Sequence, residues 1–254
     1  MNLVQHGAVY NMLSLGIASM LFTSFFLWIA RDRVLPKYRL AVMTSATVTS
    51  IAAYHYFRMF DSFNEAYTVG GTVEAGFAGY NVGYRYVDWF LTVPLLLVEL
   101  IVVLALARKL QTSLLVRLIP ASALMIALGY PGEISHDTMT RNYWGWASTI
   151  PFLYILYVLF VELTKSLARQ SEAVRKKVQL LRILLIATWG VYPITFILAM
   201  NSDGFTPDQF VAREVGYTIA DILAKCLFGL LIFSIARMKS AEDDAEFAKA
   251  EFRD

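Results

Sequence analysis

The 254-residue sequence has few charged residues and a single cysteine. Charged residues make up 17% of the chain and hydrophobic residues 57%, which is too apolar for an ordinary soluble domain and indicates several membrane spans. Because Cys226 is the sole cysteine, an intrachain disulfide bond is excluded. The stretch from Met1 to Asn11 has no lysine or arginine, so it lacks the basic segment of a signal peptide.

Seven apolar stretches are each long enough to cross a bilayer, which takes about 20 residues. They leave only short connections, so we expect an all-α membrane protein with a single seven-helix domain over residues 1–254. The predicted spans are residues 8–30, 40–60, 82–107, 114–130, 142–164, 178–200 and 211–236. A charged tail follows over about residues 237–254, and we expect it to be a solvated, frayed helix.

Basic and acidic connections alternate along the chain. Those after the first, third and fifth spans are basic, with Arg31, Arg33, Lys37, Arg39, then Arg108, Lys109, Arg117, then Lys165, Arg169, Arg175, Lys176, Lys177 and Arg182. The other connections are acidic or mixed. The positive-inside rule therefore predicts an N-terminus outside and a cytoplasmic C-terminus, in a multi-pass protein of the cell membrane. In the long outer connection at 61–81, Gly70-Gly71 predicts a short hairpin.

An aspartate and a lysine lie inside the last span, where charged residues are costly. Asp221 and Lys225 are four residues apart, so a helix places them on one face. An ionisable side chain at mid-membrane costs about 2.5–3.5 kcal/mol and usually marks a functional site. One interpretation is a buried ion pair that only locks the helix. The other is a desolvated amine that forms a Schiff base with an aldehyde, with Asp221 as its counter-charge.

Four polar residues lie on one face of the third span: Arg85, Asp88, Thr92 and Glu99. Asp88 and Glu99 are separated by about 16 Å along a helix axis, at 1.5 Å per residue. Two carboxyl groups at different depths with a hydroxyl between them are what a proton relay requires. The alternative is a set of packing residues that face a wet cavity.

These motifs together resemble the microbial (type 1) rhodopsins. The resemblance rests on Arg85-Tyr86-x-Asp88-Trp89-x-x-Thr92-x-Pro94-Leu95, on Glu99, and on Asp221-x-x-x-Lys225. Further matches are Trp189-Gly-Val-Tyr192-Pro193 in the sixth span, and Trp144 with Ser148-Thr149 in the fifth. The resemblance extends over all seven spans.

The resemblance implies a light-driven outward proton pump of the proteorhodopsin kind, a transporter and not an enzyme. Lys225 would carry all-trans retinal as a protonated Schiff base, with Asp88 as counter-ion and proton acceptor. Asp221 would be the second counter-ion, and Glu99 the cytoplasmic proton donor. Arg85 would balance Asp88 electrostatically. The lipid bilayer is the expected partner, neither a metal nor a nucleic acid is expected, and homo-oligomers are usual in the family.

The same resemblance assigns further side chains near the chromophore. His55 would pair with the acceptor Asp88, although a lone histidine in a span is more often a satisfied core residue. Leu96 falls at the position that tunes colour, where leucine implies absorption of green light. The expected wall around retinal consists of Tyr86, Trp89, Trp144, Ser148, Thr149, Trp189, Tyr192 and Pro193.

Gly145 replaces a tryptophan that packs against the retinal ring in bacteriorhodopsin-like sequences. Xanthorhodopsin-like pumps have this glycine, and a carotenoid antenna lies across the opening that it leaves; Gly132 also fits that branch. The resemblance thus allows a hydroxylated carotenoid as a second cofactor, while a simple packing glycine is the alternative.

Two questions stay open at the level of sequence. The outer proton-release carboxylates of bacteriorhodopsin do not align, and Glu133 and Glu214 are candidates that are equally consistent with solvated loop acids. The alternative function is a photosensory rhodopsin that signals to a partner protein, although such sensors more often lack a carboxylate at the position of Glu99. A light-gated channel is less consistent with the sequence because no further acidic row lines a pore, and a receptor without retinal leaves the Asp221–Lys225 pair unexplained.

Overall fold

The structure is a computed structural model that describes residues 1–67, 80–135, 137–194 and 206–251. The hairpin expected at Gly70-Gly71 and the end of the sixth predicted span lie outside these residues. The described residues form seven long helical segments: α1 (Leu3–Ala30), α2 (Pro36–Ala66), α4 (Gly83–Val103), α5 (Arg108–Glu133), α6 with η2 and α7 (Thr138–Leu167), α8 (Glu172–Trp189), and α10 with η3 and α11 (Pro207–Asp243). A short 3-10 turn, η1 (Arg31–Arg33), follows α1, and α12 (Ala245–Glu251) follows α11.

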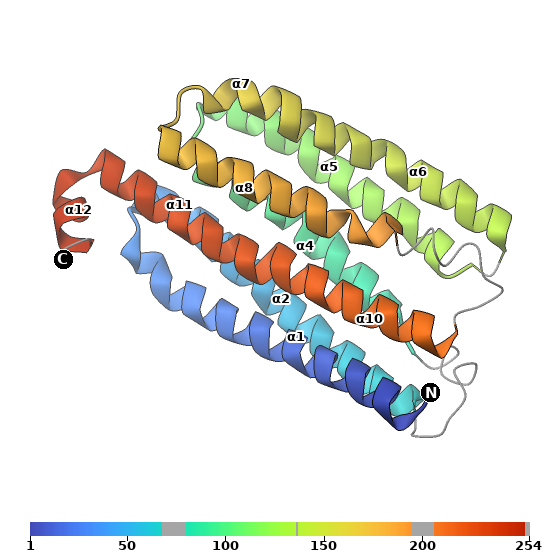
Figure 1. Ribbon diagram of the computed structural model, residues 1–254. Helices are drawn as coiled ribbons and strands as arrows, with labels where there is room; N and C mark the ends of the chain where they lie inside the picture. The colour runs from blue at the N-terminus through green and yellow to red at the C-terminus, as the bar shows by residue number, and fades with distance from the viewer. Residues whose placement is uncertain (68–79, 136, 195–205, 252–254) are drawn as a thin grey trace.

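The segments run up and down in one bundle (Figure 1). α1 packs against α2 and α10, α2 also packs against α4, and α4 packs against α5, which pairs with α6. α8 packs against α11. The N-terminus and the C-terminus lie at opposite ends of the bundle, and the connections α1–α2, α4–α5 and α7–α8 share the end of the C-terminus. All three connections with an excess of basic residues are therefore at one end.

Six of the segments are long and apolar enough to cross a membrane, and α2 is the exception among the described helices. α2 has 31 residues and is rich in serine, threonine and tyrosine. Several of these hydroxyl groups are satisfied within the helix, because Thr44, Ser45, Thr47 and Thr49 each donate to a carbonyl three or four residues earlier. A helix of this composition suits a position between other helices, and α2 lies between α1 and α4. The predicted seven-helix fold is confirmed.

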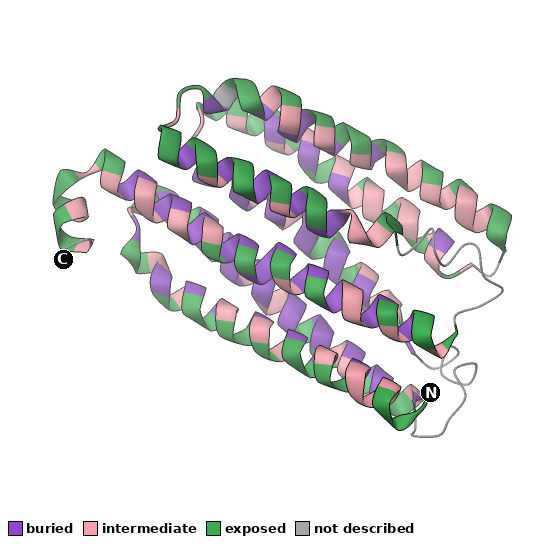
Figure 2. Ribbon diagram, in the orientation of Figure 1, coloured by how far each residue is buried: buried purple, intermediate pink, exposed green. Residues whose placement is uncertain are grey.

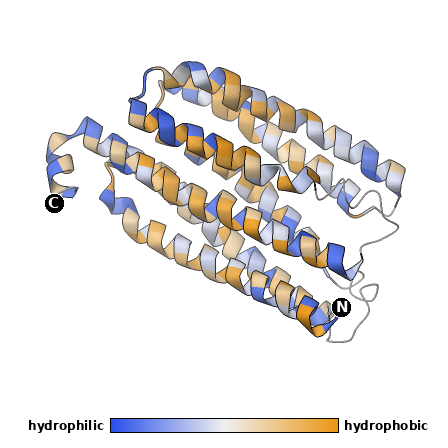
Figure 3. Cartoon of the chain, viewed as in Figure 1, coloured by the Kyte–Doolittle hydropathy of each residue, from blue (hydrophilic) through white to orange (hydrophobic). Residues whose placement is uncertain are grey.

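Buried residues lie on the faces that the helices turn toward one another, and exposed residues lie on the outside (Figure 2). Hydrophilic residues gather toward the two ends of the bundle (Figure 3). Large apolar side chains such as Phe22 (70% exposed) and Trp146 (73% exposed) cover its outer surface. In water this surface would be unfavourable, whereas a bilayer accommodates it. The protein is thus a multi-pass membrane protein.

Most helices extend beyond the predicted spans, because polar residues continue the helical turns past the apolar core. The third predicted span, 82–107, is the exception, since α4 ends at Val103. Ala105 then adopts a left-handed conformation with φ of 47°, which stops the helix before the predicted boundary. Arg117, Arg182 and Glu214 lie at the margins of their predicted spans, and the structure places them inside helices α5, α8 and α10.

The charged tail differs from the solvated, frayed helix that we expected. Lys239 and Ser240 are buried in α11 at 8% and 0% exposure. Beyond α11, the short helix α12 folds back, and the Glu251 carboxylate forms ion pairs with Arg33 (2.5 Å) and Arg237 (2.8 Å). These contacts fix the tail against the α1–α2 connection.

Two turns of π-helix interrupt the spanning segments. The first, η2 (Val158–Glu162), joins α6 to α7, and the second, η3 (Ile222–Leu227), joins α10 to α11. In η3 the Phe228 N–H donates to the Leu223 carbonyl five residues earlier. Such turns are frequent at functional sites, because they rotate side chains relative to a regular helix. η3 contains Lys225.

α1 approaches α2 closely at a glycine. A Cβ added to Gly16 would lie 2.4 Å from the Cδ1 and Cε1 atoms of Tyr56, a side chain that is fully buried. Real Cβ atoms do not approach neighbours this closely, so the Tyr56 ring occupies the space that a side chain at position 16 would take. The lack of a side chain at position 16 of α1 therefore makes room for the Tyr56 ring of α2.

We expect Gly16→Ala to destabilise the protein by about 1–3 kcal/mol, because overpacking displaces the Tyr56 ring. Gly7→Ala is the matched control on the same helix, since no atom lies within 4 Å of a Cβ at that position. Thermal unfolding in detergent measures both. Equal unfolding temperatures for the two variants would contradict the close contact.

Candidate functional site: a buried lysine with two carboxylates

Lys225 lies at the centre of the bundle and its side chain is almost fully buried. Its Nζ atom donates to Asp88 Oδ2 at 2.5 Å and to Asp221 Oδ1 at 3.0 Å. Asp88 comes from α4 and Asp221 from the end of α10, and both are 0% exposed. The structure thus brings together three residues that the sequence singled out, and one buried cation contacts two buried anions.

Asp221 is surrounded by hydrogen-bond donors. Besides Lys225, its Oδ1 atom accepts from the Tyr192 hydroxyl at 2.7 Å and from Trp89 Nε1 at 3.2 Å. Its Oδ2 atom accepts from the Tyr56 hydroxyl at 2.8 Å and from Arg85 Nη1 at 3.4 Å. Five donors, two of them cationic, stabilise the ionised form of this carboxylate.

Asp88 has far fewer contacts. Its Oδ2 atom accepts from Lys225, whereas Oδ1 has no hydrogen-bond partner among the described residues. The Thr92 hydroxyl, expected near this group, donates to the Asp88 backbone carbonyl at 2.8 Å and not to the carboxylate. The two aspartates therefore differ: Asp221 is held as an anion by many donors, and the negative charge of Asp88 depends mainly on Lys225.

A chain of alternating charges leads from Asp221 toward the end of the bundle that carries the N-terminus. Arg85 contacts Asp221 and, through Nη2, Glu214 at 2.6 Å. Arg213 contacts the other oxygen of Glu214 at 3.1 Å and Glu133 at 3.2 Å. The side chains of Glu214 and Glu133 are only 1% and 8% exposed. Glu133 and Glu214 are thus members of a buried ion network, which rules out the solvated loop acids that the sequence left open.

Tyr80 completes this network from the connection before α4. Its hydroxyl donates to Glu214 Oε2 at 2.8 Å. Burial raises the pKa of the Tyr80 phenol, and the nearby Glu214 charge raises it further. Tyr80 therefore remains a neutral donor at physiological pH and adds to the stabilisation of the Glu214 anion.

Glu99 lies on α4 on the opposite side of Asp88 from Arg85. It is 0% exposed, and neither carboxyl oxygen makes a hydrogen bond of good geometry with another described residue. An isolated carboxyl group in an apolar setting favours its protonated, neutral form. The structure thus places a carboxyl group without a counter-charge on this side of Lys225.

His55 is buried on α2 with 7% exposure. Its Nδ1 atom lies 2.9 Å from the Ile51 carbonyl, which accepts a hydrogen bond when Nδ1 is protonated. No direct His55–Asp88 hydrogen bond is present among the described residues, and Asp88 Oδ1 has no partner there. The pairing of His55 with the acceptor carboxylate stays a prediction.

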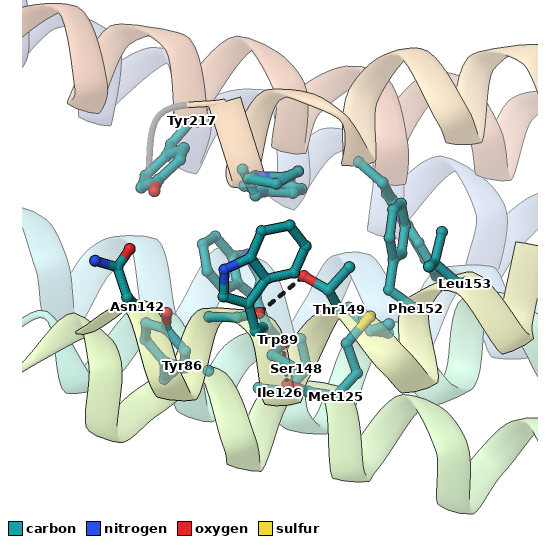
Figure 4. Close-up of a pocket in the computed structure, with 17 residues that line it drawn as sticks. Tyr86, Trp89, Met125, Ile126, Asn142, Ser148, Thr149, Phe152, Leu153 and Tyr217 are labelled. Carbon is teal, nitrogen blue, oxygen red and sulfur yellow. Dashed lines mark hydrogen bonds between the residues drawn. The ribbon is translucent and has the colours of Figure 1, made fainter. Parts of the chain in front are cut away.

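A cavity of about 490 Å³ opens between α4, α5, α6, α8 and α10 (Figure 4). Lys225 does not line it, but Trp89 and Tyr192, which do, donate to Asp221 next to the lysine. Of the expected wall residues, Tyr86, Trp89, Ser148, Thr149, Trp189, Tyr192 and Pro193 line it, as does Gly145, the position of the expected opening. The hydroxyls of Ser148 and Thr149 donate to the carbonyls of Met125 and Gly145, both at 2.8 Å. The wall is thus largely apolar and aromatic, and the hydroxyls of Ser148 and Thr149 are satisfied by the backbone.

Neither the expected wall residue Trp144 nor Leu96, the predicted colour-tuning position, lines the cavity. Trp144 instead packs edge-on against Tyr143, with ring centroids 5.3 Å apart, and Trp146 takes a place in the wall. Leu96 is buried in the core at 2% exposure, outside the cavity wall. Sequence reasoning also missed Tyr56 and Tyr217; the first binds Asp221 and the second lines the cavity. The Gly16–Tyr56 spacing cannot be recognised without the structure, since the two residues lie 40 positions apart.

Comparison with known proteins places these features in context. Residues 8–238 match the family model described as bacteriorhodopsin-like protein. The chain is 30% identical over 230 residues to the green-light absorbing proteorhodopsin of Gamma-proteobacterium EBAC31A08, covering 88% of this chain and 84% of that protein. It is 31% identical over 227 residues to archaerhodopsin-2 of Halobacterium sp. (strain aus-2), covering 87% and 82%.

Solved structures with the same fold cover nearly the whole chain. The structure of xanthorhodopsin, described as a light-driven ion pump with dual chromophore, superimposes with a TM-score of 0.88 at 45% identity, over 96% of this chain and 97% of that one. A thermophilic rhodopsin superimposes with a TM-score of 0.89 at 42% identity, over 96% and 98%.

We predict that Asp221→Asn destabilises the protein by about 3–5 kcal/mol, because it removes a buried charge that two cations contact. Asp88→Asn, the matched control, should cost less, since Lys225 keeps its contact with Asp221. Thermal unfolding of the purified variants in the dark measures the difference. An equal or larger loss for Asp88→Asn would refute the assignment of Asp221 as the main structural anion.

Proposed function

The chain belongs to the bacteriorhodopsin-like protein family, and we propose that it is a light-driven outward proton pump that carries retinal on Lys225. The observation that carries the proposal is the contact of the buried Lys225 amine with Asp88, a carboxylate that has one oxygen without a partner among the described residues. Its relatives include proteorhodopsins and a xanthorhodopsin described as a light-driven ion pump.

The residues around Lys225 fit a long, apolar aldehyde. The cavity has the volume of a small-molecule site, and Trp89, Trp189 and Tyr192 give it large, stiff walls. Trp89 and Tyr192 also donate to Asp221, so the same two side chains contact both the cavity and the counter-charge of the lysine. Lys225 would hold retinal covalently through Nζ, as a Schiff base. When bound, retinal supplies the absorption of visible light and a change of shape that alters the proton affinity of this nitrogen.

Asp88 is the best-placed proton acceptor. Its Oδ2 atom already lies 2.5 Å from Lys225 Nζ, within the range for direct proton transfer. Among the described residues, protonation of Asp88 removes a negative charge from Lys225 alone. Protonation of Asp221 would remove one from Arg85 as well. His55 and Arg85 would adjust the proton affinity of Asp88 from the two sides, as the family resemblance implies.

Glu99 is the best-placed donor on the other side of the lysine. It lies eleven residues after Asp88 on α4, nearer to the end that carries the C-terminus and the basic connections. The positive-inside rule assigns that end to the cytoplasm. In the proposed cycle, the proton on Lys225 Nζ passes outward to Asp88, Glu99 returns a proton to Nζ from the cytoplasmic side, and the cytoplasm refills Glu99. Asp88 then releases its proton to the outside, which returns each group to its starting state. The net effect is outward transport of one proton.

Gly145 and Trp146 lie where the cavity meets the outer surface of α6, so a second apolar molecule can reach the chromophore site. Trp146 is 73% exposed, which leaves its ring available to such a molecule. We include in the proposal a hydroxylated carotenoid that lies across Gly145 as a light-harvesting antenna. Absorption of green light and assembly into homo-oligomers are further parts of the proposal that rest on the family resemblance.

Membranes that contain the chain and retinal should show a visible absorption band and acidify the outside medium in light, an effect abolished by a protonophore. Asp88→Asn should abolish acidification, because the acceptor is lost, and should shift the band to the red. Glu99→Gln should leave the early proton transfer unchanged and slow reprotonation of Nζ by about 10²-fold or more, the usual contribution of a positioned acid or base.

Flash spectroscopy with a pH-sensitive dye separates these steps. A visible band without acidification would support a photosensor instead, and an unchanged slow phase in Glu99→Gln would remove Glu99 from the donor role. A colourless protein after addition of retinal would show that Lys225 is only an ion-pair partner.

The antenna makes a separate prediction. With a hydroxylated carotenoid added, the action spectrum of acidification should gain carotenoid bands, and Gly145→Trp should remove them while retinal absorption stays. Gly129→Ala is the control, because a Cβ at this other cavity glycine meets its nearest atoms at an ordinary 3.5 Å. Carotenoid bands that persist in Gly145→Trp would exclude this opening as the binding site.

A further inference from the structure

Glu99 is separated from the cytoplasmic end of the bundle by completely buried apolar side chains. Val42 of α2, Val103 of α4, and Ile232 and Ala236 of α11 lie toward that end in the register of their helices, and each is 0% exposed. A carboxyl group that takes its proton from the cytoplasm needs a polar route, and these residues interrupt it. Refilling of Glu99 therefore requires a rearrangement at this end.

A glutamine joins three segments at the same end. Gln170 lies in the turn between α7 and α8, where its Nε2 atom donates to the Leu104 carbonyl at 3.2 Å. Its Oε1 atom accepts from Lys239 Nζ of α11 at 2.5 Å. We name this set of Leu104, Gln170 and Lys239 the Gln170 bridge. The bridge connects the end of α4, the helix that carries Glu99, to the turn between α7 and α8 and to α11.

Both partners of Gln170 have unusual surroundings. Leu104 follows the last residue of α4, about 7.5 Å along the axis from Glu99, and precedes Ala105 in its left-handed conformation. Such a conformation in a residue other than glycine persists only where surrounding contacts impose it. Lys239 is a cation only 8% exposed, and its ammonium lies 5.6 Å from the centroid of the Tyr38 ring. Loss of Gln170 would thus release a strained turn and a buried charge together.

We propose that the Gln170 bridge keeps the cytoplasmic side of Glu99 closed, and that its opening precedes the refilling of Glu99. Gln170 is then a positioning residue, which acts through the end of α4. The inference rests on the proposed pump function. Because the amide of Gln170 is neutral, its separation from Leu104 breaks a hydrogen bond and no ion pair.

The full-length protein with retinal, in membranes, tests the proposal by flash spectroscopy with a pH-sensitive dye. Gln170→Ala removes both hydrogen bonds of the bridge and should accelerate proton uptake from the cytoplasmic side by about threefold or more, since one lost hydrogen bond already corresponds to about that factor. Proton transfer from Lys225 to Asp88 should keep its rate. Gln111→Ala makes the same chemical change at the same end, in the first turns of α5, and should alter neither step.

Hydrogen exchange in the dark provides a readout that does not depend on pumping. Amides at residues 102–107 should exchange faster in Gln170→Ala than in Gln111→Ala. Gln170→Glu keeps the contact with Lys239 but loses the amide donor to Leu104. It should also show faster hydrogen exchange at residues 102–107 and faster proton uptake. It serves as the second variant if Gln170→Ala does not fold.

The outcomes separate the two proposals. Absence of any light-driven proton movement in the unsubstituted protein would overturn the pump function. Normal pumping with unchanged uptake in both Gln170 variants would overturn the bridge alone, and faster exchange without faster uptake would do the same, because Gln170 would then be only structural. Faster uptake with an unchanged early step in either variant would support it.

Discussion

The structure depends on the solution to one electrostatic problem, a lysine ammonium group held inside a membrane. A buried cation is tolerated only when anions and hydrogen bonds replace water. Here Asp88 and Asp221 contact Lys225, which leaves one negative charge in excess. Arg85 contacts Asp221 and balances that charge. The positions of α4 and α10, which supply these residues, are thereby fixed relative to each other.

Ion pairing continues from the lysine site toward the N-terminal end of the bundle and stops on the side of Glu99. Toward the N-terminal end, Glu214, Arg213 and Glu133 extend the series of alternating charges. Each charge in this series has a buried partner of opposite sign. Toward the other end, Glu99 is followed by apolar side chains. A chain of paired charges resists the removal of any one member, whereas the apolar layer at the other end is held through the neutral side chain of Gln170, whose release affects the single cation Lys239. The two ends are thus suited to different movements.

The fold could be predicted from sequence because apolar length and loop charge are local properties. The Lys225 site could be predicted because ionisable residues are rare inside spans, and their spacing on a helix is informative. What could not be predicted depends on contacts between distant segments. Glu214 and Arg213 adjoin a loop in the sequence, and only the packing of α10 against the other helices shows that they are buried. Tyr56 reaches Asp221 because α1 has a glycine opposite its ring, and α4 ends early because Ala105 adopts a left-handed conformation.

Formal charge connects the two ends in the proposed cycle. Transfer of a proton from Lys225 to Asp88 removes one positive and one negative charge, so the group formed with Asp221 keeps a single negative charge. Arg85 therefore experiences the same net charge before and after this step. The proton that arrives through Glu99 raises the sum by one, because it restores the cation while Asp88 is still neutral, and release of the proton from Asp88 lowers the sum again. The first step that alters the electrostatic hold on Arg85 and on the outer ion chain thus originates on the side of Glu99, where access depends on the apolar layer and the segments that hold it closed.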